Sequence, residues 1–187
     1  VFADAHEDAT TMERSTTGEV ANMEVALLLG ETGQDAPDAL RRRLPALRPD
    51  AVVLVGQRDE RYRAETGVPS IAGRVSLQTM EDVRRNATMA GRQAAERVRR
   101  VAESWWLHVD LDILAGAEFR SCGAASDPAM PGGLTWAELT DLARGALSAG
   151  GCRGWDIVVY NPDLDPDRSD ARRIVRFVGD VLGDLTA

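Results

Sequence analysis

The stretch Ala51-Val52-Val53-Leu54-Val55-Gly56 is a continuous apolar run rich in β-branched residues. Such runs are typical of strands in parallel sheets, which are covered by helices on both faces. On either side of it, strand-like segments alternate with segments that carry apolar residues at helical spacing. This βαβ order predicts an α/β fold with a mostly parallel sheet.

About five strands and five helical segments are expected along the chain. The expected strands are 1–3, 51–56, 71–75, 105–111 and 155–160, and the expected helices are 19–29, 35–46, 79–103, 135–149 and 168–184. The fourth of these helices has a defined start, because Thr135 with Glu138 three residues later forms a capping box. No internal repeat or linker divides the chain, so a single domain over residues 1–187 is expected.

The composition and charge of the chain exclude membrane-spanning and nucleic-acid-binding proteins from the expected classes. The chain has 187 residues, of which 44% are hydrophobic. No apolar run approaches the roughly 20 residues of a membrane span, so we expect a cytoplasmic protein without a membrane partner. The net charge is -8, and residues 1–40 hold nine acidic residues against Arg14 alone. This negative field attracts cations and repels phosphate backbones, so nucleic acid is not expected as a partner.

Three short clusters of acidic residues follow expected strands. They are Asp4-Ala5-His6-Glu7-Asp8, His108-Val109-Asp110-Leu111-Asp112 and Asn161-Pro162-Asp163-Leu164-Asp165. A single acid at a strand end is usually a helix cap or a solvated loop residue. In open α/β sheets, however, the carboxyl ends of the strands converge on one ligand site. The first two clusters together supply carboxylates and imidazole, the ligands of a binuclear divalent-metal site.

These motifs resemble the arginase/agmatinase/formiminoglutamase (ureohydrolase) superfamily over nearly the whole chain. Residues 4–8 resemble its Asp-Ala-His-x-Asp motif, and residues 108–112 resemble its Ser-x-Asp-x-Asp strand. Residues 55–59, 131–135 and 161–163 are similar to further segments of the family. The resemblance implies a three-layer α/β/α fold, a small-molecule substrate and a homo-oligomer, either a trimer or a hexamer.

The resemblance also implies a set of metal ligands. It places two Mn²⁺ ions in each complete site, with Asp4 and Asp110 bridging them. It places Asp8 on one ion, and His6 and Asp112 on the other. The family's upstream Gly-Gly-Asp-His segment, which carries another His ligand, does not occur here. We therefore expect the chain to be an N-terminally incomplete arginase-like domain.

Two positions depart from the pattern of arginases. The proton-shuttling His of Ser-Gly-Asn-x-His is Ala21 here, and the guanidinium-binding Glu before Val-Asn-Pro is Val159. Arginine is therefore a doubtful substrate. Glu19 could replace a lost polar contact, although an acidic residue at a helix start is equally explained by the helix dipole.

The expected chemistry is attack of a metal-bridging hydroxide on a trigonal amidine or amide carbon. Asp8 is the candidate for carrying the proton onward. His108 either orients the metal ligand Asp110 without contacting the metal itself or takes part directly in catalysis. The leading function is cleavage of a C–N bond in a guanidino, amidino or formimidoyl compound.

Two other functions compete with the leading one. A mononuclear zinc deacetylase would need only Asp4, His6 and Asp110, whereas Asp8 and Asp112 favour two metals. A catalytically degenerate paralogue with a structural or partner-binding role would explain the departures from the arginase pattern. The number of metal ions per site distinguishes the mononuclear deacetylase from the leading function. Turnover of amidine substrates distinguishes the degenerate paralogue from an enzyme.

Overall fold

The computed structural model describes residues 1–34, 36–122 and 131–183. They form a sheet of five parallel strands in the order β3-β2-β1-β4-β5. The strands are β1 (Phe2–Ala3), β2 (Val53–Gln57), β3 (Ser76–Thr79), β4 (Trp105–Asp110) and β5 (Cys152–Val158). The short strand β1 lies at the centre because it pairs with β2 on one side and with β4 on the other.

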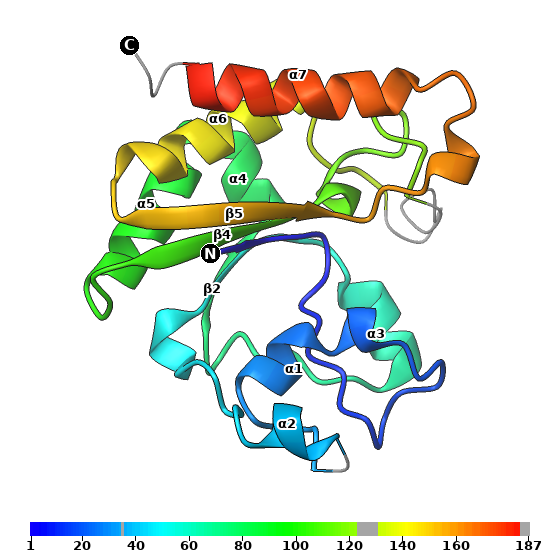
Figure 1. Cartoon of the computed structure of the whole chain (residues 1–187), viewed down its shortest axis with the longest axis vertical. Coiled ribbons are helices and arrows are strands. Elements are labelled where there is room, and N and C mark those ends of the chain that lie inside the picture. Colours follow the sequence, from blue (N-terminus) through cyan, green and yellow to red (C-terminus); the bar gives the residue numbers. More distant parts are fainter. Residues whose placement is uncertain (35, 123–130, 184–187) are drawn as a thin grey trace.

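Helices cover both faces of the sheet, which gives three layers (Figure 1). The first layer is formed by α1 (Glu24–Leu28), α2 (Asp38–Arg41) and α3 (Glu60–Thr66). The second is formed by α4 (Met80–Arg85), α5 (Ala87–Arg99), α6 (Trp136–Ser148) and α7 (Ser169–Gly183). Four 3₁₀ turns complete the described elements, namely η1 (Val20–Asn22), η2 (Pro49–Ala51), η3 (Leu111–Ile113) and η4 (Pro162–Leu164). The expected α/β class is confirmed.

Alternation along the strands divides the apolar side chains between two cores. Val53, Val55 and Val109 point toward α4, α5 and α6, where they join the larger buried cluster. Phe2 and Leu54 point to the opposite face and pack with Val25 and Leu29 from the α1 region. Because side chains two residues apart share a face, Asp4 follows Phe2 onto the face that α1 covers.

The third expected strand was placed too early in the chain. Residues 71–75 form a turn, in which the amides of Arg74 and Val75 donate to the carbonyl of Ile71. The strand itself is Ser76–Thr79. Ile71 and Val75 are apolar because they anchor this turn in the smaller core, and not because they lie in a strand.

Three expected helices are interrupted or shortened, and one helix was not expected. The segment 19–29 divides at Met23 into η1 and α1. The segment 79–103 divides at Asn86, whose extended backbone ends α4 and whose side chain accepts from Met89 to cap α5. Among the described residues of the segment 35–46, only Asp38–Arg41 forms a helix, and Pro45 would stop any longer one. Helix α3 was missed in the sequence. The capping box of Thr135 and Glu138 is present as expected. Among the described residues, no helix combines the length and apolar character that a membrane span requires.

Helices α5 and α6 cross at two glycines. A Cβ atom at Gly91 would overlap the carbonyl oxygen of Leu142, and one at Gly145 would overlap that of Thr88. The two backbones therefore approach more closely than side chains would allow. This contact fixes the helical layer behind β2 and β4.

We expect Gly91→Ala to destabilise the protein by about 1–3 kcal/mol, because the added methyl group must push the helices apart. Gly179→Ala in α7 is a matched control, since a Cβ there meets no atom within 4 Å. That variant should gain about 0.5–1 kcal/mol from the better helix propensity of alanine. Denaturant unfolding measures both changes. Equal effects in the two variants would contradict the close crossing.

Candidate metal centre

Asp4 and His6 lie in the turn that follows β1. The amide of Asp4 still donates to the carbonyl of Val55, which extends the pairing of β1 with β2 by one residue. The amide of His6 then donates to Oδ1 of Asp4 at 2.7 Å, so the chain turns tightly over the Asp4 carboxylate. Asp4 is fully buried. Its Oδ2 atom has no hydrogen-bond partner among the described residues.

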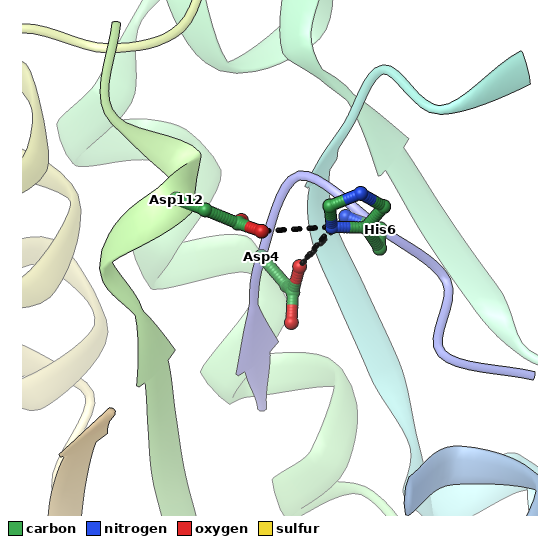
Figure 2. Close-up of side chains that lie close together, drawn as sticks. All are labelled: Asp4, His6 and Asp112. Atoms are coloured by element: carbon green, nitrogen blue, oxygen red, sulfur yellow. Dashed lines mark hydrogen bonds and ion pairs between the residues drawn. The ribbon is translucent and has the colours of Figure 1, made fainter. Parts of the chain in front are cut away.

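Asp110 and Asp112 reach the same place from β4. Asp112 lies beyond the strand, in η3, and its amide donates to Oδ1 of Asp110 at 2.8 Å. Its carboxylate accepts from the amide of Ala5 and lies 2.8 Å from Nδ1 of His6. Figure 2 shows the imidazole of His6 directed at both Asp112 and Asp4. The carboxyl ends of β1 and β4 thus bring the first two sequence clusters together.

Two groups of three side chains in the described part of the chain could each hold a metal ion. One is Asp4, His6 and Asp112, and the other is Asp4, His108 and Asp110. Within each group, one ligand atom from each residue lies within 4.8 Å of the others. Asp4 belongs to both groups, so the two candidate positions are adjacent and share a carboxylate.

Charge at this centre is poorly balanced without a cation. Burial, and then the charge of Asp112, raise the pKa of Asp4. Burial and the neighbouring Asp4 and Asp112 raise the pKa of Asp110 to about 9. Burial alone would lower the pKa of His6, but hydrogen bonds to Asp112 and Asp4 raise it to about 12. The metal-free centre therefore holds protons that a cation would replace.

Asp112 behaves differently from the other carboxyl groups. Burial alone would raise its pKa, but the hydrogen bond from His6 and the charge of His6 lower it. Arg58 supports the same turn by donating to the carbonyl oxygens of Asp112 and Leu114. Asp112 and His6 thus form an ion pair in the metal-free protein.

Asp8 lies beside this centre but in neither three-residue group. Burial, and then the charges of Asp4 and Glu24, raise the pKa of Asp8 well above its ordinary value. The backbone of Asp8 has a positive φ of 44°. Its carbonyl accepts from the amides of Val25 and Ala26, which ties the loop to the start of α1.

Glu24 is a neighbour of this centre that the sequence motifs did not reveal. It is the first residue of α1, and its Oε2 atom is buried without a hydrogen-bond partner among the described residues. Burial raises its pKa, and it interacts electrostatically with Asp4, Asp8 and His108. An acid in a first helical turn is ordinarily solvated. Only the packing of α1 on the sheet directs this one inward.

The remaining predicted residues lie apart from the centre. Glu19 is exposed at the start of η1, where its Oε2 accepts from the side chain of Asn22 at 3.4 Å. Ala21 is exposed as well. Val159 follows β5 with a φ of 71°, which is an outlier for a β-branched residue. The structure does not bring Glu19 or Ala21 to the metal-binding groups.

Several acids of the clusters have structural partners. Glu7 is buried, where it accepts from Ser70 and Ile71 and lies 3.2 Å from Arg63. Asp165 accepts from the amides that open α7 and from Tyr160. The third cluster therefore serves mainly to start α7. Clustered acids alone do not distinguish a ligand from a cap.

The segment 115–133 between β4 and α6 is long, and loops of this length in compact domains are usually functional or disordered, so we expect it to border the substrate pocket. Residues 123–130 lie outside the described part of the chain, so this expectation stays a prediction. The described flank is held to the sheet end, because the amide of Ala115 donates to Leu134 and the amide of Asn161 donates to Ser121.

Comparison with known proteins agrees with this architecture. A sequence profile described as the Arginase family matches residues 1–183. The arginase of Bacillus caldovelox is 28% identical over an alignment of 191 residues. The alignment covers 98% of this chain and 60% of that protein. The arginase of Bacillus subtilis (strain 168) is 25% identical over 188 residues, with the same coverage of 98% and 60%. The chain thus spans about 60% of the length of these curated relatives.

Solved structures show the same fold. The native arginase of Bacillus caldovelox superposes with a TM-score of 0.76 at 26% identity, covering 97% of this chain and 59% of that one. The formimidoylglutamase of Bacillus subtilis superposes with a TM-score of 0.67 over 98% of this chain and 51% of that one. Its 20% identity supports a common fold alone. From the match over residues 1–183, the chain belongs to the arginase family, within the ureohydrolase superfamily.

Proposed function

We propose that this protein is a binuclear-metal hydrolase that cleaves a C–N bond of a guanidino, amidino or formimidoyl compound. The observation that carries the proposal is the pair of ligand groups that share the buried Asp4. Two Mn²⁺ ions, when bound, would lower the pKa of a water held between them and so supply a nucleophile at neutral pH.

The residues present fit such ions. Carboxylate and imidazole are ligands that suit Mn²⁺. The Oδ2 atom of Asp4 is buried without a hydrogen-bond partner among the described residues, and a buried acceptor of this kind is costly unless something binds it. Burial first, and then the charge of neighbouring carboxylates, raise the pKa values of Asp4 and Asp110, and a bound cation would offset both effects.

Two further carboxyl groups could handle the substrate and its protons. Asp8 lies beside Asp4, and burial together with the charge of Asp4 raises its pKa, which favours the protonated form that a proton carrier needs. We propose it as the group that carries a proton from the nucleophile toward the leaving nitrogen. Glu24 adds a second carboxyl group with a raised pKa on the same face. We propose that Glu24 receives the polar end of a substrate.

The uptake of metal should depend on pH. In the metal-free protein at pH 7, His6 and Asp110 each hold a proton, because their pKa values of about 12 and about 9 lie above that pH. Ligation requires a neutral imidazole and an ionised carboxylate, so binding displaces both protons. We expect release of about two protons per chain and an affinity that increases as pH rises toward about 9. Calorimetry in buffers of different ionisation enthalpy measures this release, and a buffer-independent heat would contradict it.

Turnover of a substrate panel tests the proposed function. The full-length protein loaded with Mn²⁺ should hydrolyse at least one of arginine, agmatine, guanidinobutyrate, formiminoglutamate and hydroxyarginine, and Asp8→Asn should lower that rate by a factor of about 10² or more. Glu19→Gln is the matched control, since Glu19 is exposed and lies outside both ligand groups. Its rate should not change.

Absence of turnover across the whole panel would redirect the assignment. If the protein binds two Mn²⁺ ions and turns over none of these compounds, the second candidate function holds, namely a paralogue that has lost catalysis. Ala21 and Val159 are the specific observations in its favour, because both replace polar residues of the arginase pattern.

A further inference from the structure

His108 occupies a confined position on the sheet face that α1 covers. It lies in β4, and its ring stacks on that of Phe2 from β1 with centroids 4.1 Å apart. Its side chain is only 18% exposed. The ring is therefore held between neighbouring strands and is not a solvated surface histidine.

The side of the ring that faces the metal centre meets unsatisfied acceptors. A ring nitrogen of His108 and one carboxylate oxygen each from Asp4 and Asp110 lie within 4.8 Å of one another. Asp4 is fully buried, and its Oδ2 atom has no hydrogen-bond partner among the described residues. These three ligand-type atoms, one of which comes from a buried carboxyl group with an unpaired oxygen, form a candidate cation site.

A second carboxylate fixes the chemistry of the ring. The Nδ1 atom of His108 lies 2.7 Å from Oδ2 of Asp156, which is its register partner on β5. A carboxylate only accepts, so Nδ1 carries the hydrogen and Nε2 keeps its lone pair when the ring is neutral. The other oxygen of Asp156 accepts from the indole of Trp106, which holds the carboxylate in place.

We propose that His108, through Nε2, ligates one of the two metal ions together with Asp4 and Asp110. Asp156 is a positioning residue that orients the ring. Carboxylate–histidine–metal arrangements of this kind fix the ring tautomer and raise the basicity of the ligand. The inference rests on the proposed function and extends it, because the family pattern has Ser at position 108 and so assigns no imidazole there. His6 and Asp112 would hold the other ion, again with Asp4.

The test measures bound Mn²⁺ in the full-length protein and in three variants. His108→Phe keeps a ring to stack on Phe2 but removes the nitrogen. His6→Phe is the matched change in the other ligand group. Both should bind one ion where the unchanged protein binds two, and both should lose the electron paramagnetic resonance signal of a spin-coupled pair. Asp156→Asn should bind both ions with an affinity lower by about 10- to 100-fold.

Each outcome decides between the two proposals. If the unchanged protein binds two ions and His108→Phe also binds two with unchanged affinity, this inference is overturned while the proposed function stands. If the unchanged protein binds none, both are overturned. Melting temperatures in chelator report whether the variants fold. If His108→Phe does not fold, Asp156→Asn decides, because unchanged Mn²⁺ affinity in that variant overturns the positioning role and with it the ligation.

Discussion

Asp4→Asn is expected to abolish binding at both metal positions, whereas Asp112→Asn should weaken only one. Asp4 belongs to both ligand groups, and Asp112 belongs to one. An asparagine at position 4 still accepts from the amide of His6 but cannot neutralise two cations. We expect Mn²⁺ affinity to fall by more than about 100-fold at both positions, since even the loss of an outer partner costs 10- to 100-fold.

The same two variants should have opposite effects on the stability of the metal-free protein. Folding raises the pKa of Asp4, so this carboxyl group opposes folding at pH values above its unfolded pKa, and Asp4→Asn removes that opposition. Folding lowers the pKa of Asp112, so its ionised form contributes stability above its unfolded pKa and loses it as pH falls through the folded value. Asp112→Asn removes the charge of the nearer of the two carboxylates that pair with His6, at a cost of about 3 kcal/mol.

Melting temperatures in chelator measure these effects. Asp4→Asn should melt above the unchanged protein, and Asp112→Asn should melt below it. Metal analysis of the same samples completes the comparison. A variant Asp4→Asn that still binds two ions, or one that melts as low as Asp112→Asn, would show that Asp4 does not bridge the two groups.

The second prediction concerns arginine, which the protein should hydrolyse poorly even when fully loaded with metal. At the position where the arginase pattern has a proton-shuttling His, this chain has Ala21, and a site that lacks this general acid–base group would lose a factor of roughly 10² to 10⁴. Val159 replaces the carboxylate that receives the guanidinium group, and an unpaired buried cation costs roughly 3 kcal/mol or more. A substrate with a less basic or modified amidine would suffer less from both changes.

A double variant that restores the His and Glu of the arginase pattern is the control for this prediction. Ala21→His with Val159→Glu should raise kcat/KM for arginine without changing the number of bound ions. Val159 has a φ of 71°, a conformation that strains a β-branched side chain, so an unbranched residue relieves that strain and offsets part of the cost of placing a carboxyl group against the larger core. Arginase-level turnover of arginine by the unchanged protein would refute the account of both positions.

Local sequence patterns correctly predicted those helices and strands whose residues are compatible with a single type of secondary structure. The run Val52–Val55 is buried between two helical layers, and nothing but a covered strand accommodates it. The side chains of Thr135 and Glu138 each accept a hydrogen bond from the other's backbone amide, so the start of α6 could be predicted without tertiary contacts. By contrast, Ile71 and Val75 are equally apolar in a strand or in a buried turn. Only the contact of Ile71 with Glu7 decides between them.

The candidate site divides in the same way. Asp4, His6, Asp110 and Asp112 follow central strands, so their convergence follows from parallel topology. Glu24 and Asp156 could not be found in the sequence, because their roles depend on how α1 packs on the sheet and on the register of β4 with β5. Glu19 stood nearer to the motifs than Glu24, yet its place in η1 leaves it exposed.

The most direct test of the central claim is the number of metal ions in the full-length protein. Elemental analysis after saturation with Mn²⁺ and removal of free ions should give two Mn²⁺ per chain, as expected for two ligand groups that share Asp4. One zinc ion per chain with no second metal at saturation would contradict the binuclear centre and would favour a mononuclear deacetylase-like site instead.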